Sequence, residues 1–149
     1  MATFENQVTV AAPPEVVFDA VAHIETFSQI APDIIGVEFL TDSRTGIGTR
    51  FRETRSLGSR EATTELEVTE SEAPTHDRLV AVEGGITWDP AFDVAADDGG
   101  TRLTRRMDAT PTGLKGKAAL PLITPMLTKA MDKDLAAIVA WCEGQTASE

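Results

Sequence analysis

The chain has 149 residues, of which 42% are hydrophobic and 25% charged, the composition of one globular domain with its own core. Its formal net charge of −11 disfavours nucleic acid and anionic membrane surfaces as partners. It holds one cysteine, no apolar run of about 18 residues and an acidic N-terminal stretch, so we expect no internal disulfide, no transmembrane helix and no signal peptide. These features predict a single cytoplasmic domain over residues 1–149.

The first third of the chain predicts a strand, two short helices and a second strand. Residues 3–11 alternate in polarity and are rich in β-branched side chains, as strands are. The Pro-Pro pair that follows suits the first positions of a helix. A second short helix is predicted over residues 24–30 and must end before Pro32. Residues 36–42 then form the second predicted strand.

Residues 48–57 and 60–70 predict a hairpin whose register can be worked out from the sequence. The two residues between them, Gly58 and Ser59, are typical of a type II′ turn. Folding the chain there gives one face of opposite charges and one largely apolar face, and the agreement of the two patterns supports the register. The predicted partners are Arg50 with Glu67, Arg52 with Glu65, Phe51 with Leu66, Glu53 with Thr64, and Arg55 with Ala62.

Three more strands are predicted over residues 78–83, 86–96 and 101–110. A hairpin centred on Asp98 and Gly99 pairs the last two strands, Val94 with Leu103 and Phe92 with Arg105. For residues 78–83 the inward face stays open between the even-numbered valines and the odd-numbered leucine and alanine. On the last hairpin, one face carries Trp88, Phe92, Val94, Leu103, Arg105 and Met107.

Residues 120–143 have an apolar stripe at spacings of three and four, which predicts one α-helix roughly 36 Å long. Pro121 and Pro125 lie early in it, so its first turns are expected to be irregular or kinked. Residues 144–149 are predicted to be a disordered tail. The order of elements predicts an α+β fold, in which this helix packs on one face of an antiparallel sheet of about seven strands.

The chain resembles the START/SRPBCC superfamily, and within it the polyketide cyclase/dehydrase-like branch. The likeness lies in VAAPPEVVF at residues 10–18, GIGTRFR at 46–52, ELEVTE at 65–70, GTRLT at 100–104 and the long closing helix. The resemblance implies a helix-grip fold, as in the birch-pollen allergen, with a curved seven-stranded sheet around the helix and an apolar cavity between them. Members bind lipids, sterols, polyketides or plant hormones, and a few catalyse cyclisation or dehydration.

Three charges fall on inner faces that are otherwise apolar: Glu53, Arg55 and Arg105. One interpretation is a polar cluster in a cavity, with Arg105 binding a ligand oxygen and Glu53 acting as general acid or base. The other is an ion pair of Glu53 with Arg55 or Arg105 that holds strands together. The candidate catalytic pair is Glu53 and Arg105. The candidate ligand contacts are Phe51, Glu53, Arg55, Leu66, Trp88, Phe92, Arg105, Met107, Met126, Leu127, Ala130 and Met131; for each apolar member, plain core packing is the alternative.

His23 and His76 have no metal-binding partners at suitable spacing, so no metal and no cofactor is expected. Three hypotheses remain. The first is a monomeric or homodimeric carrier of a small hydrophobic ligand. The second is a polyketide cyclase, aromatase or dehydratase acting in the same cavity. The third is a protein-interaction module whose acidic surface docks a basic partner.

Overall fold

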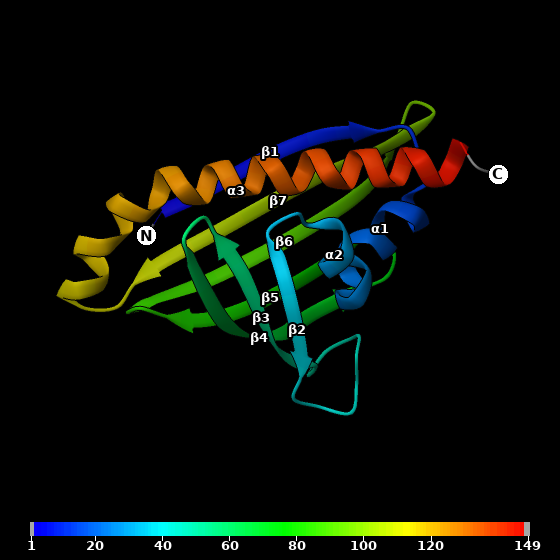
Figure 1. Ribbon diagram of the computed structural model, residues 1–149. Coiled ribbons are helices and arrows are strands. Elements are labelled where there is room, and N and C mark those ends of the chain that lie inside the picture. The colour runs from blue at the N-terminus through cyan, green and yellow to red at the C-terminus, as the bar shows by residue number, and fades with distance from the viewer. Residues whose placement is uncertain (1, 148–149) are drawn as a thin grey trace.

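The computed structural model describes residues 2–147 of the chain. A single antiparallel sheet has the strand order β1-β7-β6-β5-β4-β3-β2. The helix α3 crosses one face of this sheet, and α1 and α2 lie near the C-terminal end of α3 (Figure 1). The elements are β1 (Ala2–Val10), α1 (Pro14–Ala22), α2 (Ile24–Ile30), β2 (Ile34–Phe39), β3 (Arg50–Leu57), β4 (Arg60–Glu72), β5 (His76–Glu83), β6 (Ile86–Asp97), β7 (Gly100–Pro111) and α3 (Leu114–Ala147). The predicted α+β helix-grip architecture is confirmed.

The predicted hairpin registers are also confirmed. The strands β3 and β4 pair as the turn at Gly58 requires, and Gly58 has the left-handed φ of 74° that a type II′ turn needs at its first position. On the outer face, Arg50 reaches Glu65, its diagonal neighbour on β4, at 3.7 Å, and Arg52 reaches Glu38, its direct partner on β2, at 2.8 Å. The β6–β7 hairpin pairs Val94 with Leu103 and Phe92 with Arg105.

The inward face of β5, which the sequence left open, consists of its odd-numbered residues. Leu79 and Ala81 are buried, whereas Val82 is 69% exposed. Asp77 has the same parity and is 3% exposed, so it is also on the inner face. The sequence alone did not distinguish the two faces because both parities of this strand carry apolar residues, Val80 and Val82 on one and Leu79 and Ala81 on the other.

The structure corrects several boundaries. The helix α3 begins at Leu114 instead of residue 120 and continues through Ala147 instead of ending at 143. Residues 144–147 are therefore helical and not a disordered tail, since a single glycine weakens a helix by only about 1 kcal/mol and need not end it; residues 148–149 lie outside the described residues. The strand β2 spans Ile34–Phe39 rather than 36–42.

Pro121 and Pro125 lie inside α3, whose first turns bend away from the axis of the rest of the helix (Figure 1). A proline has no backbone N–H and its ring crowds the preceding turn, so it is a common cause of such a bend. In the same stretch, the hydroxyl of Thr124 donates to the carbonyl of Leu120 at 2.8 Å. The irregular helix start expected from these prolines is thus confirmed.

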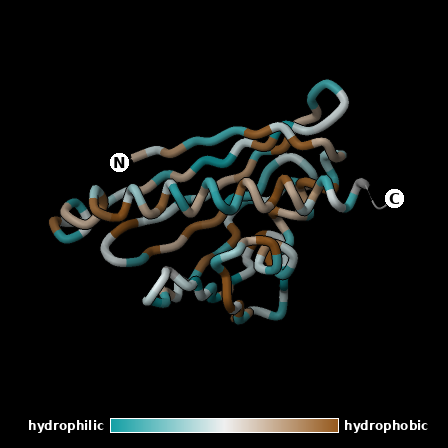
Figure 2. The backbone as a smooth tube through the Cα atoms, turned by 45° about the horizontal axis from the view of Figure 1, so that its top comes forward, coloured by the Kyte–Doolittle hydropathy of each residue, from teal (hydrophilic) through white to brown (hydrophobic). Residues whose placement is uncertain are grey.

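The C-terminal half of α3 is fixed by a core shared with α1 and the sheet. Leu135, Ile138 and Cys142 are at most 3% exposed, and they pack in one cluster with Phe18 and Leu103. Along α3, hydrophobic and hydrophilic residues alternate, as expected of a helix with one buried side (Figure 2). Two polar contacts flank this core, one from Asp132 to Asn6 of β1 and one from Lys133 to Asp33 between α2 and β2. Exposed polar contacts of this kind add little stability, so the burial of apolar side chains contributes most to holding this half of the helix in place.

At the start of α3, the backbone of Gly116 packs directly against the backbone of Gly85, with no side chain between them. A Cβ added to Gly116 would lie 2.1 Å from the carbonyl oxygen of Gly85, in the β5–β6 turn. That oxygen also accepts a hydrogen bond of 2.7 Å from the backbone N–H of Thr112. Glycine at position 116 therefore lets the helix start directly against the turn.

We predict that Gly116→Ala lowers the free energy of unfolding by about 1–3 kcal/mol, because a backbone atom would have to move to admit the methyl group. Urea denaturation measures the change. Gly144→Ala is the matched control, since a Cβ at Gly144 in the same helix meets nothing within 4 Å. It should leave the stability unchanged or raise it by up to about 1 kcal/mol. Equal effects of the two substitutions would contradict the contact.

Candidate functional site

A cavity of about 630 Å³ lies between the inner face of the sheet, α3 and the two short helices. Most of its wall is apolar, and strand alternation explains this, because every second residue of a strand points to the same face. Every ligand contact predicted from the sequence is in this wall. These residues are Phe51, Glu53 and Arg55 of β3, Leu66 of β4, Trp88 and Phe92 of β6, Arg105 and Met107 of β7, and Met126, Leu127, Ala130 and Met131 of α3. That they bind a ligand stays a prediction.

The apolar members differ in depth. Met131 is 1% exposed and belongs to the packed interior, whereas Met126 is 49% exposed and lies where the wall meets solvent. Phe92 is buried and has the ring of Phe27 from α2 at its edge, with 6.0 Å between ring centroids. The cavity is therefore walled by a fixed aromatic pair on one side and bounded by a flexible methionine on another.

The inward charges form one cluster with a residue that the sequence analysis did not single out, Asp134 of α3. The Asp134 carboxylate accepts hydrogen bonds from both terminal nitrogens of Arg55, at 3.3 and 3.0 Å. It also accepts one from Nη1 of Arg105, at 3.1 Å. Glu53 accepts from Nε of Arg55 at 3.2 Å. The predicted pairing of Glu53 with Arg55 is thus present, but the partner of Arg105 is Asp134.

The spacing of Asp134 is a signal that could have found it. It lies three residues after Met131 and four before Ile138, and therefore on the apolar stripe of the helix. Its side chain is 1% exposed. A carboxylate at such a position needs a buried cationic partner, because an unpaired buried charge is costly. Two inward-facing arginines were already predicted on the sheet.

Arg105 is the more enclosed of the two arginines in the cluster and is 6% exposed. Its guanidinium carbon is 5.1 Å from the centroid of the Phe92 ring. Burial lowers its pKa, and Asp134 acts in the opposite direction; an arginine nonetheless stays protonated at any physiological pH. Its Nε is buried and has no hydrogen-bond partner in the structure. The cavity wall therefore contains a donor that no protein atom satisfies.

Asp77 is a second acidic residue of the wall that the sequence analysis missed. It is opposite Phe92 on β6 and opposite Ser71 on β4. Burial raises the pKa of its carboxyl to about 7, against the weaker opposing effects of a hydrogen bond from Ser71 and the charge of His76. It was missed because the inward face of β5 was not assigned, although Asp77 shares the parity of Leu79 and Ala81.

The histidines take no part in the cavity wall. His76 points to the outer face, where its ring nitrogens lie 2.7 Å from Glu70 and 2.7 Å from Asp93. Partial burial opposes the protonation of His76, but these two hydrogen bonds outweigh it and raise its pKa. Among residues 2–147, no three or more His, Cys, Asp or Glu side chains are grouped so as to hold a metal ion.

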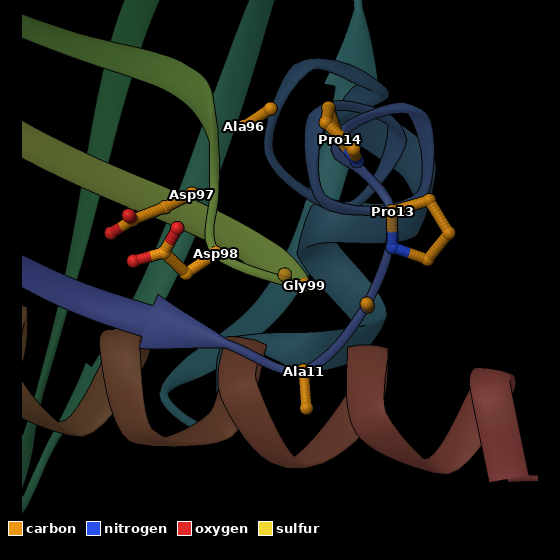
Figure 3. A pocket seen from close by; sticks show the side chains of 9 residues that line it. Ala11, Pro13, Pro14, Ala96, Asp97, Asp98 and Gly99 are labelled. Atoms are coloured by element: carbon orange, nitrogen blue, oxygen red, sulfur yellow. The ribbon is translucent and has the colours of Figure 1, made fainter.

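A second hollow, also of about 630 Å³, lies outside the sheet, where residues 11–14 pass the β6–β7 turn. Asp97 and Asp98 are its charged residues, and their side chains point away from Pro13 and Pro14 (Figure 3). The rest of its lining is alanine, proline and glycine. No polar groups converge in it, so the internal cavity is the candidate site.

A long helix held over a curved sheet, with a mostly apolar cavity between them, defines the class of helix-grip ligand-binding folds. The chain belongs to the polyketide cyclase/dehydrase and lipid transport family, whose model matches residues 1–143. The resemblance to the START/SRPBCC superfamily is confirmed. A search of the curated proteins finds no match to this sequence. No helix within residues 2–147 is long and apolar enough to cross a membrane.

Solved structures share the fold at low sequence identity. The aromatase/cyclase Zhui from Streptomyces sp. R1128 is 18% identical with a TM-score of 0.77, over 97% of this chain and 95% of that one. One such structure, Ara h 8.0201, is 18% identical with a TM-score of 0.76, over 99% of both chains. The di-domain aromatase/cyclase StfQ from the steffimycin pathway is 13% identical with a TM-score of 0.81, over 97% of this chain and 51% of that one.

We predict that Asp134→Asn lowers the free energy of unfolding by about 3–5 kcal/mol, because it removes the counter-ion that the buried Arg105 shares with the half-buried Arg55. Urea denaturation at neutral pH measures the loss. Asp132→Asn is the control, since Asp132 is an exposed carboxylate of the same helix that accepts one hydrogen bond from Asn6. Its effect should stay below about 1 kcal/mol. Similar losses for both variants would show that Asp134 does not hold the cluster together.

Proposed function

We propose that this protein binds a small, uncharged and mostly apolar molecule in the cavity, and that Nε of Arg105 donates a hydrogen bond to an oxygen of that molecule. The unsatisfied Nε carries this proposal. A buried donor without an acceptor costs about 1–3 kcal/mol. A ligand carbonyl, ether or hydroxyl oxygen would remove that cost, while the apolar wall would bury the remainder of the ligand.

The charges of the cluster support an uncharged ligand. Glu53 and Asp134 offset Arg55 and Arg105, so the four side chains have no net formal charge. A carboxylate ligand would add an uncompensated negative charge in a mostly apolar cavity, and such a charge is costly to bury. The donor at Arg105 is already held by Asp134 and the Phe92 ring, so little conformational freedom is lost when it binds.

The comparisons agree with this proposal at the level of the family. The description of the family includes lipid transport, and the aromatase/cyclases among the similar structures carry their activity in their names. Transport or storage of a lipophilic molecule is therefore the function that the cavity supports best.

A cyclase, aromatase or dehydratase is the second candidate, and one observation favours it. The predicted catalytic residues Glu53 and Arg105 both line the cavity. However, Glu53 accepts a hydrogen bond of 3.2 Å from Nε of Arg55 in an ion pair, so its carboxylate is already engaged by the protein. One measurement distinguishes the two candidate functions: incubation of the protein with an uncharged poly-ketone, followed by analysis of the products. An enzyme would convert the compound, whereas a carrier would bind and release it unchanged.

We predict that Arg105→Lys weakens the binding of 2-acetylnaphthalene, an uncharged probe with one ketone, about tenfold or more, since a hydrogen bond to a charged group contributes about 1.5–3 kcal/mol. Lysine keeps the charge that Asp134 needs but lacks Nε. Quenching of Trp88 measures binding. The chain has two tryptophans and no tyrosine, so Trp141→Phe leaves the cavity tryptophan as the only emitter.

Arg106→Lys is the matched control, because Arg106 points to the outer face and pairs with Asp108 at 3.3 Å. Its affinity for the probe should equal that of the Trp141→Phe parent. Thermal denaturation of each variant verifies that it is folded. Absence of quenching in the parent, or equal affinities of the Arg105 and Arg106 variants, would contradict the proposed role.

A further inference from the structure

We propose that Asp77, in its protonated form, donates a hydrogen bond to a second oxygen of the ligand, so that the cavity loses affinity for that ligand when Asp77 loses its proton. This inference rests on the proposed function, and it narrows the ligand to uncharged molecules with an oxygen acceptor toward each end. Its basis is the position of Asp77 in the wall, its neighbours, and its distance from Arg105.

Asp77 differs from the other buried carboxylates of the cavity in having no basic partner. Glu53 and Asp134 each accept hydrogen bonds from an arginine. Asp77 is 3% exposed, and no basic side chain among residues 2–147 forms an ion pair with it. A carboxyl in this position is more easily buried neutral than charged, and a neutral carboxyl has an O–H to donate.

The surroundings of Asp77 contain little that would stabilise its ionised form. Its cross-strand neighbours on the inner face are Phe92 and Ser71. The parts of α1 and α2 in the cavity wall are Val21, Ile24, Phe27 and Ser28, none of which titrates. His76, next to it in β5 but on the outer face, is the charged group that acts on it, and Ser71 is its hydrogen-bond donor. Burial outweighs both, so the pKa of Asp77 is about 7.

The other charged groups of the wall are accounted for elsewhere. On β3, β7 and α3 they form the neutral cluster of Glu53, Arg55, Arg105 and Asp134. The remaining ones, Arg60 and Glu61 of β4 and Glu83 of β5, are exposed and lie at the hairpin ends of these strands. Hydration therefore screens them from the buried carboxyl.

The spacing of the two donors defines the class of ligand. Asp77 pairs with Phe92, and Phe92 pairs with Arg105, so the two donor residues are in one row across the sheet with a single strand between them. Two strand spacings correspond to roughly 10 Å between their Cα atoms. A fused-ring or similarly extended molecule with an acceptor oxygen at each end can span the two donors, whereas a molecule with one acceptor engages only one.

The test compares 2,6-diacetylnaphthalene, with a ketone at each end, and 2-acetylnaphthalene, with one. Their affinities are measured by Trp88 quenching at pH 5.5 and pH 8.5 in the Trp141→Phe parent. With a pKa of about 7, the protonated fraction of Asp77 falls about thirtyfold between these pH values. The affinity for the diketone should fall by up to about the same factor, and the advantage of the diketone over the monoketone should be lost at pH 8.5.

Two substitutions separate hydrogen-bond donation from simple neutrality. Asp77→Asn keeps a donor without a titratable proton, so it should bind the diketone tightly at both pH values. Asp77→Leu is neutral but has no donor, so it should bind the diketone no better than the monoketone at either pH. Asp98→Asn, in the exposed β6–β7 turn, is the control and should behave as the parent.

Each other outcome counts against the inference. If the parent binds the monoketone but gains nothing from the second ketone, Asp77 is not a ligand contact, although the proposed function stands. If the pH effect persists in Asp77→Asn, it arises from another group such as His76, and the inference is wrong. If neither ketone quenches Trp88 at either pH, the inference and the proposed function fall together. Thermal denaturation at both pH values verifies that each variant is folded.

Discussion

One carboxylate joins the helix to two distant strands of the sheet. Asp134 of α3 binds Arg55 of β3 and Arg105 of β7, which are four strand positions apart in the sheet order. In a flat sheet those strands would be about 19 Å apart. In a sheet that curls around the helix, both arginines can reach the same carboxylate from the two sides. The same curvature of the sheet encloses the cavity. The ion pairs of Asp134 therefore connect the helix to the sheet at the place where the candidate site forms.

Such a cluster has a specific energetic character. Burying two carboxylates and two guanidinium groups costs desolvation energy that their attraction only partly repays, so the cluster is weak evidence for stability as such. Its geometry is instead its distinguishing feature: Asp134 and the Phe92 ring hold the Arg105 guanidinium while Nε remains without a partner. Polar groups fixed in advance in an apolar wall are the usual means by which a lipophilic pocket orients its ligand.

The sequence predicted the elements and the hairpin registers because the signals there are local. At Gly58 the turn residues and the charge ladder agree, and both depend only on neighbours across one turn. The start of α3 could not be placed in this way, since Pro121 is as typical of a helix boundary as of a bend within a helix. Its position depends on the tertiary contact between Gly116 and Gly85.

The apolar part of the site, its two arginines and Glu53 were predicted, but Asp77 and Asp134 were not. Alternation on β3, β6 and β7 places Phe51, Phe92 and Arg105 on one face whatever the rest of the chain does. The prediction of Asp77 depended on the parity of β5, which could not be assigned because both faces of that strand carry apolar side chains. Asp134 follows Asp132 and Lys133, so it looks like part of a hydrated surface. Only its spacing of three residues from Met131 indicates that it lies on the apolar stripe of the helix.

The two prolines of α3 give the helix an uneven resistance to opening. At each of them the carbonyl four residues earlier, that of Lys117 and that of Pro121, loses its usual backbone donor. The C-terminal half has a full set of donors and the Leu135–Cys142 core beneath it. Amide hydrogens of the first turns should therefore exchange with solvent through local fraying, well before those around Asp134. The C-terminal half of α3 is therefore expected to be rigid, whereas its N-terminal turns open more easily. Met126, at the edge of the cavity, lies in the part that opens more easily.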